Sequence, residues 1–457
     1  MRTERDSFGE FAVPDDALYG AHTARSLRHF DVAGEPVPIE MIHAMIRLKW
    51  ACARANEKTG GLEKEKAEAI GRACREALDG RYDPHFPIDV MQAGSGTSSN
   101  MNVNEVLANR ACEILGGRRG ERGRVHPNDD VNRGQSTNDI FPSAIRVACV
   151  EMTQELLVRL DEMTAVLRAK QFEFSEVLKS GRTHLQDAVP VTLGQEFGAW
   201  ARAMEKAAAR IRAAHDTLLE VPVGGNAVGT GLNTSRMFRT AIVAELSELT
   251  GQLFRVPEDG LEATQFLTDL AQFSSALRLL AADIRKLCGD LRLLASGPHT
   301  AIGEIRLPAV EPGSSIMPGK INPSIPEAAT MACLAVMGYD QATQLACADG
   351  QLELNTHMPL AGWMLVRSIR MLRRTCSMLT GHCLAGIEAR REVCARNFER
   401  SAGLATILNP RLGYDRVAEL VKESLASGRT LRELVLAKGL LSEGEYDQIL
   451  CTSTGPV

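Results

Sequence analysis

Eleven residues from Gly313 to Pro323 carry groups that could bind an anion. They read Gly-Ser-Ser-Ile-Met-Pro-Gly-Lys-Ile-Asn-Pro. Two glycines, two prolines and two serines in so short a run exclude a regular helix or strand, so we expect a loop with a defined backbone. Backbone N–H groups, the Lys320 ammonium and the Asn322 amide can all donate hydrogen bonds to an anion.

Two further segments are rich in hydroxyl and amide side chains. The first runs from Gln92 to Asn104 and has almost no charge, which suits neither a helix interior nor an apolar core. It is either a loop that caps a helix continuing from Glu105 through Ile114, or a site whose uncharged donors bind carboxylates, and we favour the site. The second runs from His126 to Asp139 and is expected to be a polar loop that leads into a helix.

Two other breaks interrupt the helical patterns. Ser180 to Pro190 brings Thr183 and His184 together, although a single histidine is more often structural than catalytic. Gly224 to Thr234 has a Gly-x-Gly spacing, but no βαβ unit surrounds it, so a dinucleotide site and a dehydrogenase are not expected. We interpret this second break as a tight turn between helices.

Long helices are predicted to position these loops. Apolar residues recur at intervals of three and four, which is typical of bundle helices. They are Met152, Leu156, Leu160, Met163 and Leu167 in one helix, and Leu277, Leu280, Ile284, Leu287, Leu291 and Leu294 in another. The second helix also carries Leu279 and Leu293 away from its main stripe. A helix that is apolar on several sides favours a large bundle shared between subunits.

Composition limits the class of protein. The chain has 457 residues, 44% of them hydrophobic, and a net charge of −5, so neither nucleic acid nor an anionic membrane is an expected partner. No apolar run is long enough to span a bilayer and the first residues lack a targeting core, which predicts a cytoplasmic protein. The 11 cysteines are scattered without a Cys-x-x-Cys pair, so we expect buried free thiols and no metal site.

The pattern divides the chain into three predicted domains. Residues 1–136 form a mixed, mainly helical domain, residues 137–388 a central domain of long helices, and residues 389–457 a small helical C-terminal domain.

The loop from Gly313 to Pro323 resembles the hallmark loop of the fumarase/aspartase superfamily, Gly-Ser-Ser-x-Met-x-x-Lys-x-Asn. Four more segments match the family's motifs in the same order, so the resemblance covers essentially the whole chain. They are Gly94 to Thr97, Gln135 to Asp139, Gly181 to Asp187 and Ala227 to Asn233. The resemblance implies a mostly α-helical homotetramer around a twenty-helix core, with each active site assembled from three subunits.

The family reaction is β-elimination from a succinyl skeleton to give fumarate, without a cofactor. A proton leaves the carbon next to a carboxylate, and the resulting dianionic aci-carboxylate needs donors that hold both carboxylates more tightly as charge develops. The resemblance implies that Ser314 is the base, with His184 and Glu327 as a further catalytic pair. It implies substrate-binding roles for Ser95, Thr97, Ser136, Thr137, Asn138, Thr183, Lys320 and Asn322.

The sequence contains both fumarase-like and aspartase-like segments, so it gives conflicting indications of the leaving group. Early segments such as Leu18 to Thr23 and Gly94 to Thr97 are more similar to class II fumarases, which act on malate. Later ones, Glu262 to Gln265 and Asp290 to Leu294, are more similar to aspartases. Thr137 stands where fumarases typically have a second serine, and we give this binding residue the most weight.

The sequence therefore predicts an aspartate ammonia-lyase, a carbon-nitrogen lyase that converts L-aspartate to fumarate and ammonia. The alternative is a class II fumarate hydratase, a carbon-oxygen lyase. A catalytically silent structural or binding member is a remote alternative, because every expected active-site position is filled.

Overall fold

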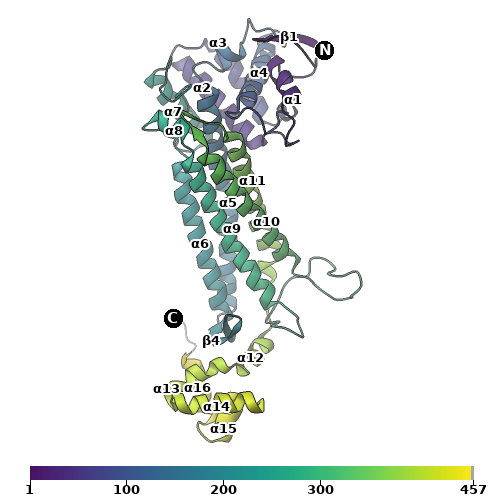
Figure 1. The fold of residues 1–457 in the computed structure, drawn as a ribbon, viewed down its shortest axis with the longest axis vertical. Coiled ribbons are helices and arrows are strands. Elements are labelled where there is room, and N and C mark those ends of the chain that lie inside the picture. The colour runs from purple at the N-terminus through teal and green to yellow at the C-terminus, as the bar shows by residue number, and fades with distance from the viewer. Residues whose placement is uncertain (454–457) are drawn as a thin grey trace. The chain divides into compact units, whose positions relative to one another are not determined.

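The computed structural model describes residues 1–453, with the side chains of residues 1–450. Most of this range is helical, and its strands form four two-stranded sheets, which confirms the predicted mainly α-helical class. Five long helices dominate (Figure 1). They are α5 (Thr137–Glu173), α6 (Leu193–Thr217), α9 (Thr268–Leu294), α10 (Ser324–Ala348) and α11 (Met358–His382).

The apolar stripes of the sequence become the buried faces of these helices. Leu156, Leu160 and Leu167 of α5 are 0% exposed, and so are Leu277 and Ile284 of α9. Residues three or four apart lie on the same side of a helix, so each stripe faces the neighbouring helices. This confirms the two predicted bundle helices.

The chain forms two compact units, each built from three segments. The first unit contains residues 1–157, 209–281 and 334–373, and the second contains residues 158–208, 282–333 and 374–457. The chain passes from one unit to the other within the long helices. The division into three domains at residues 136 and 388 stays a prediction.

The first unit surrounds α2 with shorter helices, since α2 contacts α3, α4 and α7. Its N-terminal strands β1 and β2 pair as an antiparallel hairpin. Besides its parts of the long helices, the unit contains β1 (Arg2–Asp6), β2 (Gly9–Val13), α1 (Ala21–His29), α2 (Ile39–Lys58), α3 (Lys64–Leu78), η1 (Asp83–His85), α4 (Thr97–Ile114), η2 (Pro127–Val131), α7 (Arg236–Thr250), α8 (Gly260–Gln265), β6 (Gly350–Gln351) and β7 (Leu354–Asn355).

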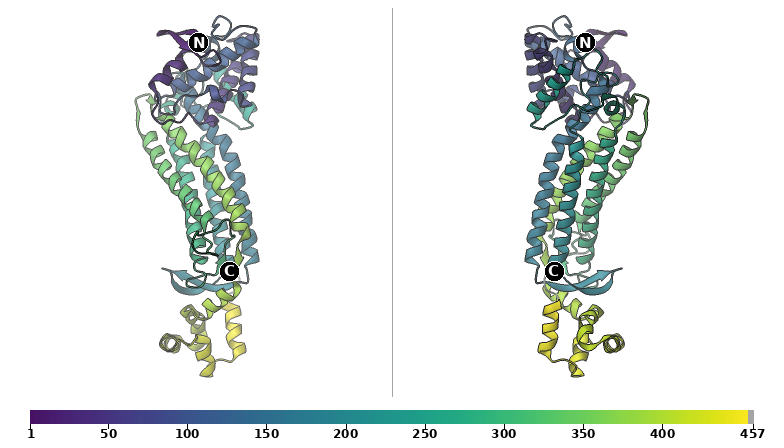
Figure 2. Two further views of the ribbon diagram at one scale, coloured as in Figure 1. Left: turned by 90° about the vertical axis from the view of Figure 1, so that its right-hand side faces the viewer. Right: turned by 90° about the vertical axis from the view of Figure 1, so that its left-hand side faces the viewer.

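The second unit contains an antiparallel hairpin that lies against α12 (Figure 2). Its C-terminal helices have a core of their own, in which Leu408, Leu434 and Val435 are 0% exposed. The unit contains β3 (Leu178–Thr183), β4 (Gln186–Thr192), β5 (Ile305–Arg306), η3 (Leu384–Gly386), β8 (Glu388–Ala389), α12 (Arg391–Glu399), η4 (Ala402–Leu404), α13 (Ala405–Leu412), α14 (Tyr414–Ser427), α15 (Leu431–Ala437) and α16 (Glu443–Ser453).

Within residues 1–453, none of the helices is long and apolar enough to cross a membrane. The ten cysteines whose side chains are described are all free and buried, as the sequence predicts.

Candidate active site

The segment from Ser95 to Thr97 is held in a fixed conformation at the start of α4. Gly96 has a φ of 83°, in the left-handed region that favours glycine, and a Cβ atom there would lie 2.1 Å from the Phe141 ring. The Ser95 and Thr97 hydroxyl oxygens lie 2.9 Å apart. Both residues are half-buried, so their hydroxyls remain within reach of a small ligand.

The polar segment from Gln92 to Asn104 is more helical than expected. Helix α4 begins at Thr97, eight residues before the predicted Glu105. Long-range contacts explain the difference, because the buried Asn102 amide donates to the His85 carbonyl at 3.0 Å and so has a partner outside the helix.

A second group of predicted binding residues lies at the N-terminus of α5. The Asp139 carboxylate accepts backbone N–H groups from Ser136 at 2.9 Å, Gly224 at 2.9 Å and Asn226 at 2.8 Å. Asp139 is fully buried, and burial raises its pKa to about 6. These bonds join the segment from Ser136 to Asn138 to the turn at Gly224, so the glycine-rich break in the sequence supports a binding segment.

Thr137 connects the two groups of the first unit. Its hydroxyl oxygen accepts a hydrogen bond of 3.1 Å from the Asn100 amide, and Asn100 lies about one helical turn after Thr97. The Asn138 amide donates to the Ala227 carbonyl at 2.8 Å. The first unit therefore carries Ser95, Thr97, Ser136, Thr137 and Asn138 on segments tied together by side-chain hydrogen bonds.

Thr183 and His184 lie at the tip of the β3–β4 hairpin. Thr183 pairs with Gln186, and the two residues between them, His184 and Leu185, have φ values of 54° and 58°. Positive φ at both central residues is the geometry of a type I′ turn, which usually selects asparagine and glycine. Residues without a glycine's freedom adopt this backbone at a cost of about 1–3 kcal/mol each, and such strain clusters at functional sites.

A buried ion cluster holds strand β3 of this hairpin just below its tip. Glu304 is 0% exposed and accepts hydrogen bonds from Arg182 at 2.7 and 3.0 Å and from Asn397 at 3.1 Å, while the Lys179 ammonium lies 3.2 Å away. Burial alone would raise the pKa of Glu304, but the Arg182 hydrogen bonds and the Lys179 charge outweigh it and lower the pKa below its usual value.

The segment from Gly313 to Pro323 is the predicted loop, immediately before α10 (Figure 1). The Ser314 hydroxyl oxygen accepts the backbone N–H groups of Ile316 at 3.2 Å and Met317 at 3.0 Å. The Lys320 ammonium donates to the Asn322 side-chain oxygen at 2.8 Å. The loop lines an open hollow of about 420 Å³, so it has room for a small ligand.

The expected pair of His184 and Glu327 is not formed within this chain. Glu327 lies in the first turn of α10 and its carboxylate faces Arg292 at 3.8 Å. The exposed His184 imidazole makes no hydrogen bond or ion pair to any described residue. The pairing therefore stays a prediction, and within the described chain Thr183, His184, Ser314, Lys320, Asn322 and Glu327 belong to the second unit.

The structure adds supporting residues that sequence reasoning missed. Lys49 of α2 is 0% exposed and contacts the polar segment before α5, and Glu304 binds Arg182 of β3 just below the hairpin tip. The available signal for Lys49 was a lysine on the same helical face as the apolar Met45 and Ile46. No local signal marked Glu304.

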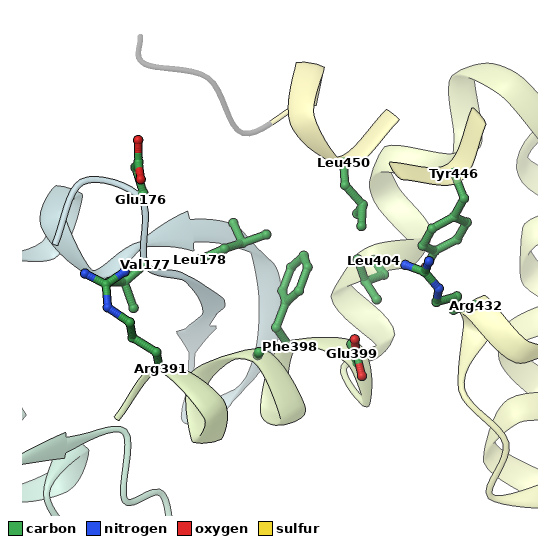
Figure 3. Close-up of a pocket in the computed structure, with 11 residues that line it drawn as sticks. Glu176, Val177, Leu178, Arg391, Phe398, Glu399, Leu404, Arg432, Tyr446 and Leu450 are labelled. Atoms are coloured by element: carbon green, nitrogen blue, oxygen red, sulfur yellow. The ribbon is translucent and has the colours of Figure 1, made fainter. Parts of the chain in front are cut away.

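A different cavity, of about 330 Å³, lies in the second unit near its C-terminal helices (Figure 3). Apolar side chains, among them Leu178, Phe398 and Leu404, line it, with Arg391 and Arg432 nearby. Since its lining includes none of the predicted site residues, it is not the candidate active site.

Comparisons with known proteins place the chain in a family. Residues 9–338 match the family described as Lyase, and residues 404–453 match the Fumarase C C-terminus. The chain belongs to the fumarase/aspartase superfamily, as the sequence motifs indicate.

Several relatives are similar over their full length. The class II fumarate hydratase of Chromobacterium violaceum is 48% identical over 98% of this chain and 97% of its own, and that of Myxococcus xanthus is 46% identical over 98% and 96%. Among solved structures, a fumarate lyase:delta crystallin from Brucella melitensis bound to cobalt has a TM-score of 0.97, with 42% identity over 100% of both chains. The class II fumarase from Schistosoma mansoni has a TM-score of 0.94, with 38% identity over 98% of this chain and 97% of its own.

These relatives correct the predicted leaving group. The prediction of an aspartate ammonia-lyase, and with it a carbon-nitrogen lyase, is wrong, because full-length relatives at 45–48% identity are class II fumarate hydratases. The error came from the weight placed on Thr137. Serine and threonine present the same hydroxyl donor, so this substitution does not by itself change how a carboxylate is held.

Proposed function

We propose that the chain is a class II fumarate hydratase, a carbon-oxygen lyase that interconverts malate and fumarate plus water. The observation that carries the proposal is the full-length identity of 45–48% to class II fumarate hydratases. Its substrates are then small dicarboxylates, and the polar segments of both units supply suitable donors.

Binding requires uncharged donors and one cation. Thr97, Ser136, Thr137, Asn138 and Thr183 offer hydroxyl and amide protons, and Lys320 with Asn322 adds a cation and an amide from the loop. Hydrogen bonds to a carboxylate are stronger than hydrogen bonds between two neutral groups, and they become stronger as the substrate gains charge in the transition state.

Ser314 is the proposed base that removes the proton from the carbon next to a malate carboxylate. A serine hydroxyl is normally too weak for this role, so its deprotonated form needs stabilisation. The two N–H groups of Ile316 and Met317 directed at its oxygen support that role. The C–H electron pair moves into the carboxylate to give the aci-carboxylate. Its collapse to fumarate breaks the C–O bond, and the hydroxyl leaves as water with a proton supplied by the His184 and Glu327 pair.

His184 and Glu327 are proposed to act on the departing or attacking water. Both are accessible in the single chain, His184 at a hairpin tip and Glu327 at a helix start. We propose that they pair between subunits, with each site assembled from three chains.

A homotetramer is the proposed assembly. Large apolar side chains remain exposed along α9 and α10 in the single chain, where water would otherwise meet them. Their exposed fractions are 37% for Leu279, 41% for Leu293, 66% for Met331, 49% for Leu334 and 64% for Leu345. Leu279 and Leu293 are the residues that lie off the main stripe in the sequence, and a partner's helices would cover them.

The proposal is tested by supplying purified protein with L-malate and, separately, with L-aspartate while following fumarate by its ultraviolet absorbance. We expect fumarate from malate and none from aspartate. Fumarate from aspartate alone would overturn the proposal, and no product from either would favour a silent member of the superfamily.

A further inference from the structure

Lys49 is a buried lysine beneath the binding segment at the start of α5. Its ammonium donates to the Asn132 side-chain oxygen at 2.7 Å and to the Gln135 side-chain oxygen at 2.9 Å. The residue is 0% exposed, and burial lowers its pKa to about 7, although the nearby Asp139 charge acts in the opposite direction. A buried lysine is costly unless its hydrogen-bonding groups are satisfied, and here two amide oxygens accept from two of the three N–H groups.

The N–H groups of Lys49 determine which atoms donate and which accept in the hydrogen bonds that connect Asn132, Asn100 and Thr137. An ammonium can only donate, so the Asn132 amide must turn its oxygen toward Lys49. That oxygen also faces Asn100, which must then present its NH₂ group, and it does so at 3.3 Å. The same NH₂ group donates to the Thr137 hydroxyl oxygen at 3.1 Å.

The direction of the hydrogen bond from Asn100 to Thr137 determines whether the Thr137 hydroxyl can donate its proton to a substrate. Because its oxygen accepts from Asn100, its proton is left to donate elsewhere. A substrate carboxylate has acceptors only, so it requires that proton. If the Asn100 amide were reversed, its oxygen would instead compete for the Thr137 proton. Asn100 itself is 1% exposed, so water has little access to this relay.

We propose that Lys49 is a positioning residue that, through Asn132 and Asn100, directs the Thr137 hydroxyl proton toward the substrate carboxylate. This role rests on the proposed hydratase function. Lys49 does not touch the substrate.

The first test removes the ammonium with Lys49→Met, which keeps a chain of similar length. We expect kcat/KM for malate to fall about tenfold to hundredfold, the loss typical of one hydrogen bond to a charged group. Lys170→Met is the matched control, because Lys170 is also buried and donates to the Ile387 carbonyl at 2.8 Å, away from the binding segment. An unchanged kcat/KM in Lys49→Met would overturn the proposal.

A double-mutant cycle separates positioning from general destabilisation. Thr137→Val removes the hydroxyl that Lys49 is proposed to direct. If Lys49 acts through Thr137, the double variant has the same kcat/KM as Thr137→Val alone, within about twofold. If the loss of kcat/KM in the double variant equals the product of the losses in the two single variants, Lys49 acts independently of Thr137 and the proposal is overturned.

If Lys49→Met does not fold, the near-isosteric variant Asn100→Asp tests the same proposal. Asn100→Asp presents an acceptor to Thr137 and reverses the hydrogen bond without changing side-chain size. Circular dichroism checks the fold. We expect this variant to show a similar loss of kcat/KM, and wild-type kinetics in a folded Asn100→Asp protein would contradict the inference.

Succinate, an unreactive dicarboxylate, separates this inference from the proposed function. Its affinity is measured by calorimetry for the wild type, Lys49→Met and Asn100→Asp, and we expect about tenfold weaker binding in both variants. If the wild type binds succinate but does not hydrate fumarate, the proposed function fails while the affinities still decide the role of Lys49. A wild type that binds no succinate would overturn both.

Discussion

Arg182 and Glu304 lie 122 residues apart in the chain and are joined by two hydrogen bonds of 2.7 and 3.0 Å. The pair sits beneath the hairpin tip that carries Thr183 and His184. Glu304 is 0% exposed and Lys179 is 1% exposed at its side chain, so this is a charge cluster removed from water. This cluster does not contact the substrate. Its ion pairs hold the hairpin in place.

Removing the Glu304 charge should destabilise the protein. Glu304→Gln leaves the Arg182 cation without its carboxylate partner in a mostly buried setting, while Lys179 keeps the Glu196 carboxylate at 2.8 Å, so the change should cost about 3 kcal/mol of unfolding free energy. Chemical denaturation followed by circular dichroism measures the difference. Glu388→Gln is the control, since Glu388 and Arg306 form an exposed pair 3.3 Å apart, and it should change stability by less than about 1 kcal/mol.

The same pair predicts a pH dependence of stability. The pKa of Glu304 is lowered in the folded protein, because the Arg182 and Lys179 contacts outweigh the opposing effect of burial. Its contribution is therefore fully present above the unfolded value of about 4.3 and is lost as pH falls through the lower folded value. The stability difference between the wild type and Glu304→Gln should shrink below about pH 4, and a difference that grows on acidification would contradict this assignment.

Ser314→Ala should keep the fold and lose nearly all turnover. The variant removes the proposed base, and loss of general base catalysis is expected to lower kcat about 10²- to 10⁴-fold. Ser315→Ala is the matched control, because Ser315 is the exposed neighbour in the same loop. Initial rates with malate compare the two variants, and equal activity in both would remove Ser314 from the mechanism.

Much of the fold could be predicted because its signals are local. The stripe that includes Leu156 and Leu160 has the spacing of one helical face, and the glycines and prolines between Gly313 and Pro323 exclude regular structure over a few residues. Such patterns require no knowledge of distant parts of the chain. The superfamily followed from five motifs in order, which the family matches confirm.

Long-range contacts were beyond the reach of sequence patterns. Lys49 binds Asn132 and Gln135 from 83 and 86 residues away, and no local period reveals such a pair. The early start of α4 has the same cause, because the Asn102 NH₂ group has a partner outside the helix that local patterns do not reveal. The prediction of the leaving group failed for a different reason. The hydroxyl of Thr137 can donate to a carboxylate whether ammonia or water leaves, so it does not distinguish the two reactions.

Thr137→Ser therefore should preserve hydratase activity. The change removes a methyl group and keeps the hydroxyl that accepts from Asn100, so kcat/KM for malate should stay within about threefold of the wild type. Thr137→Val, which keeps the shape and removes the hydroxyl, should lose about tenfold to hundredfold. If Thr137→Ser gained turnover of aspartate or lost that of malate, the methyl group would matter for the leaving group after all.

Gly96→Ala should destabilise the protein. The residue has a φ of 83°, and an added Cβ would meet the Phe141 ring at 2.1 Å, so backbone strain and overpacking add to at least about 2 kcal/mol of unfolding free energy. Thermal and chemical denaturation measure the loss. Gly123→Ala is the control, because a Cβ there meets nothing within 4 Å, and its stability should lie within about 0.5 kcal/mol of the wild type.

Charges placed on the exposed face of α10 should break the proposed tetramer. Leu345 is 64% exposed in the single chain, and burying a glutamate at that position against a partner would cost several kcal/mol. Leu345→Glu should therefore shift the protein to smaller assemblies in light scattering coupled to size-exclusion chromatography, and turnover should fall with the tetramer if sites are shared. Leu425→Glu is the matched control on α14, where Leu425 is 77% exposed, and it should leave the assembly unchanged. An intact tetramer in Leu345→Glu would exclude this part of α10 from the interface.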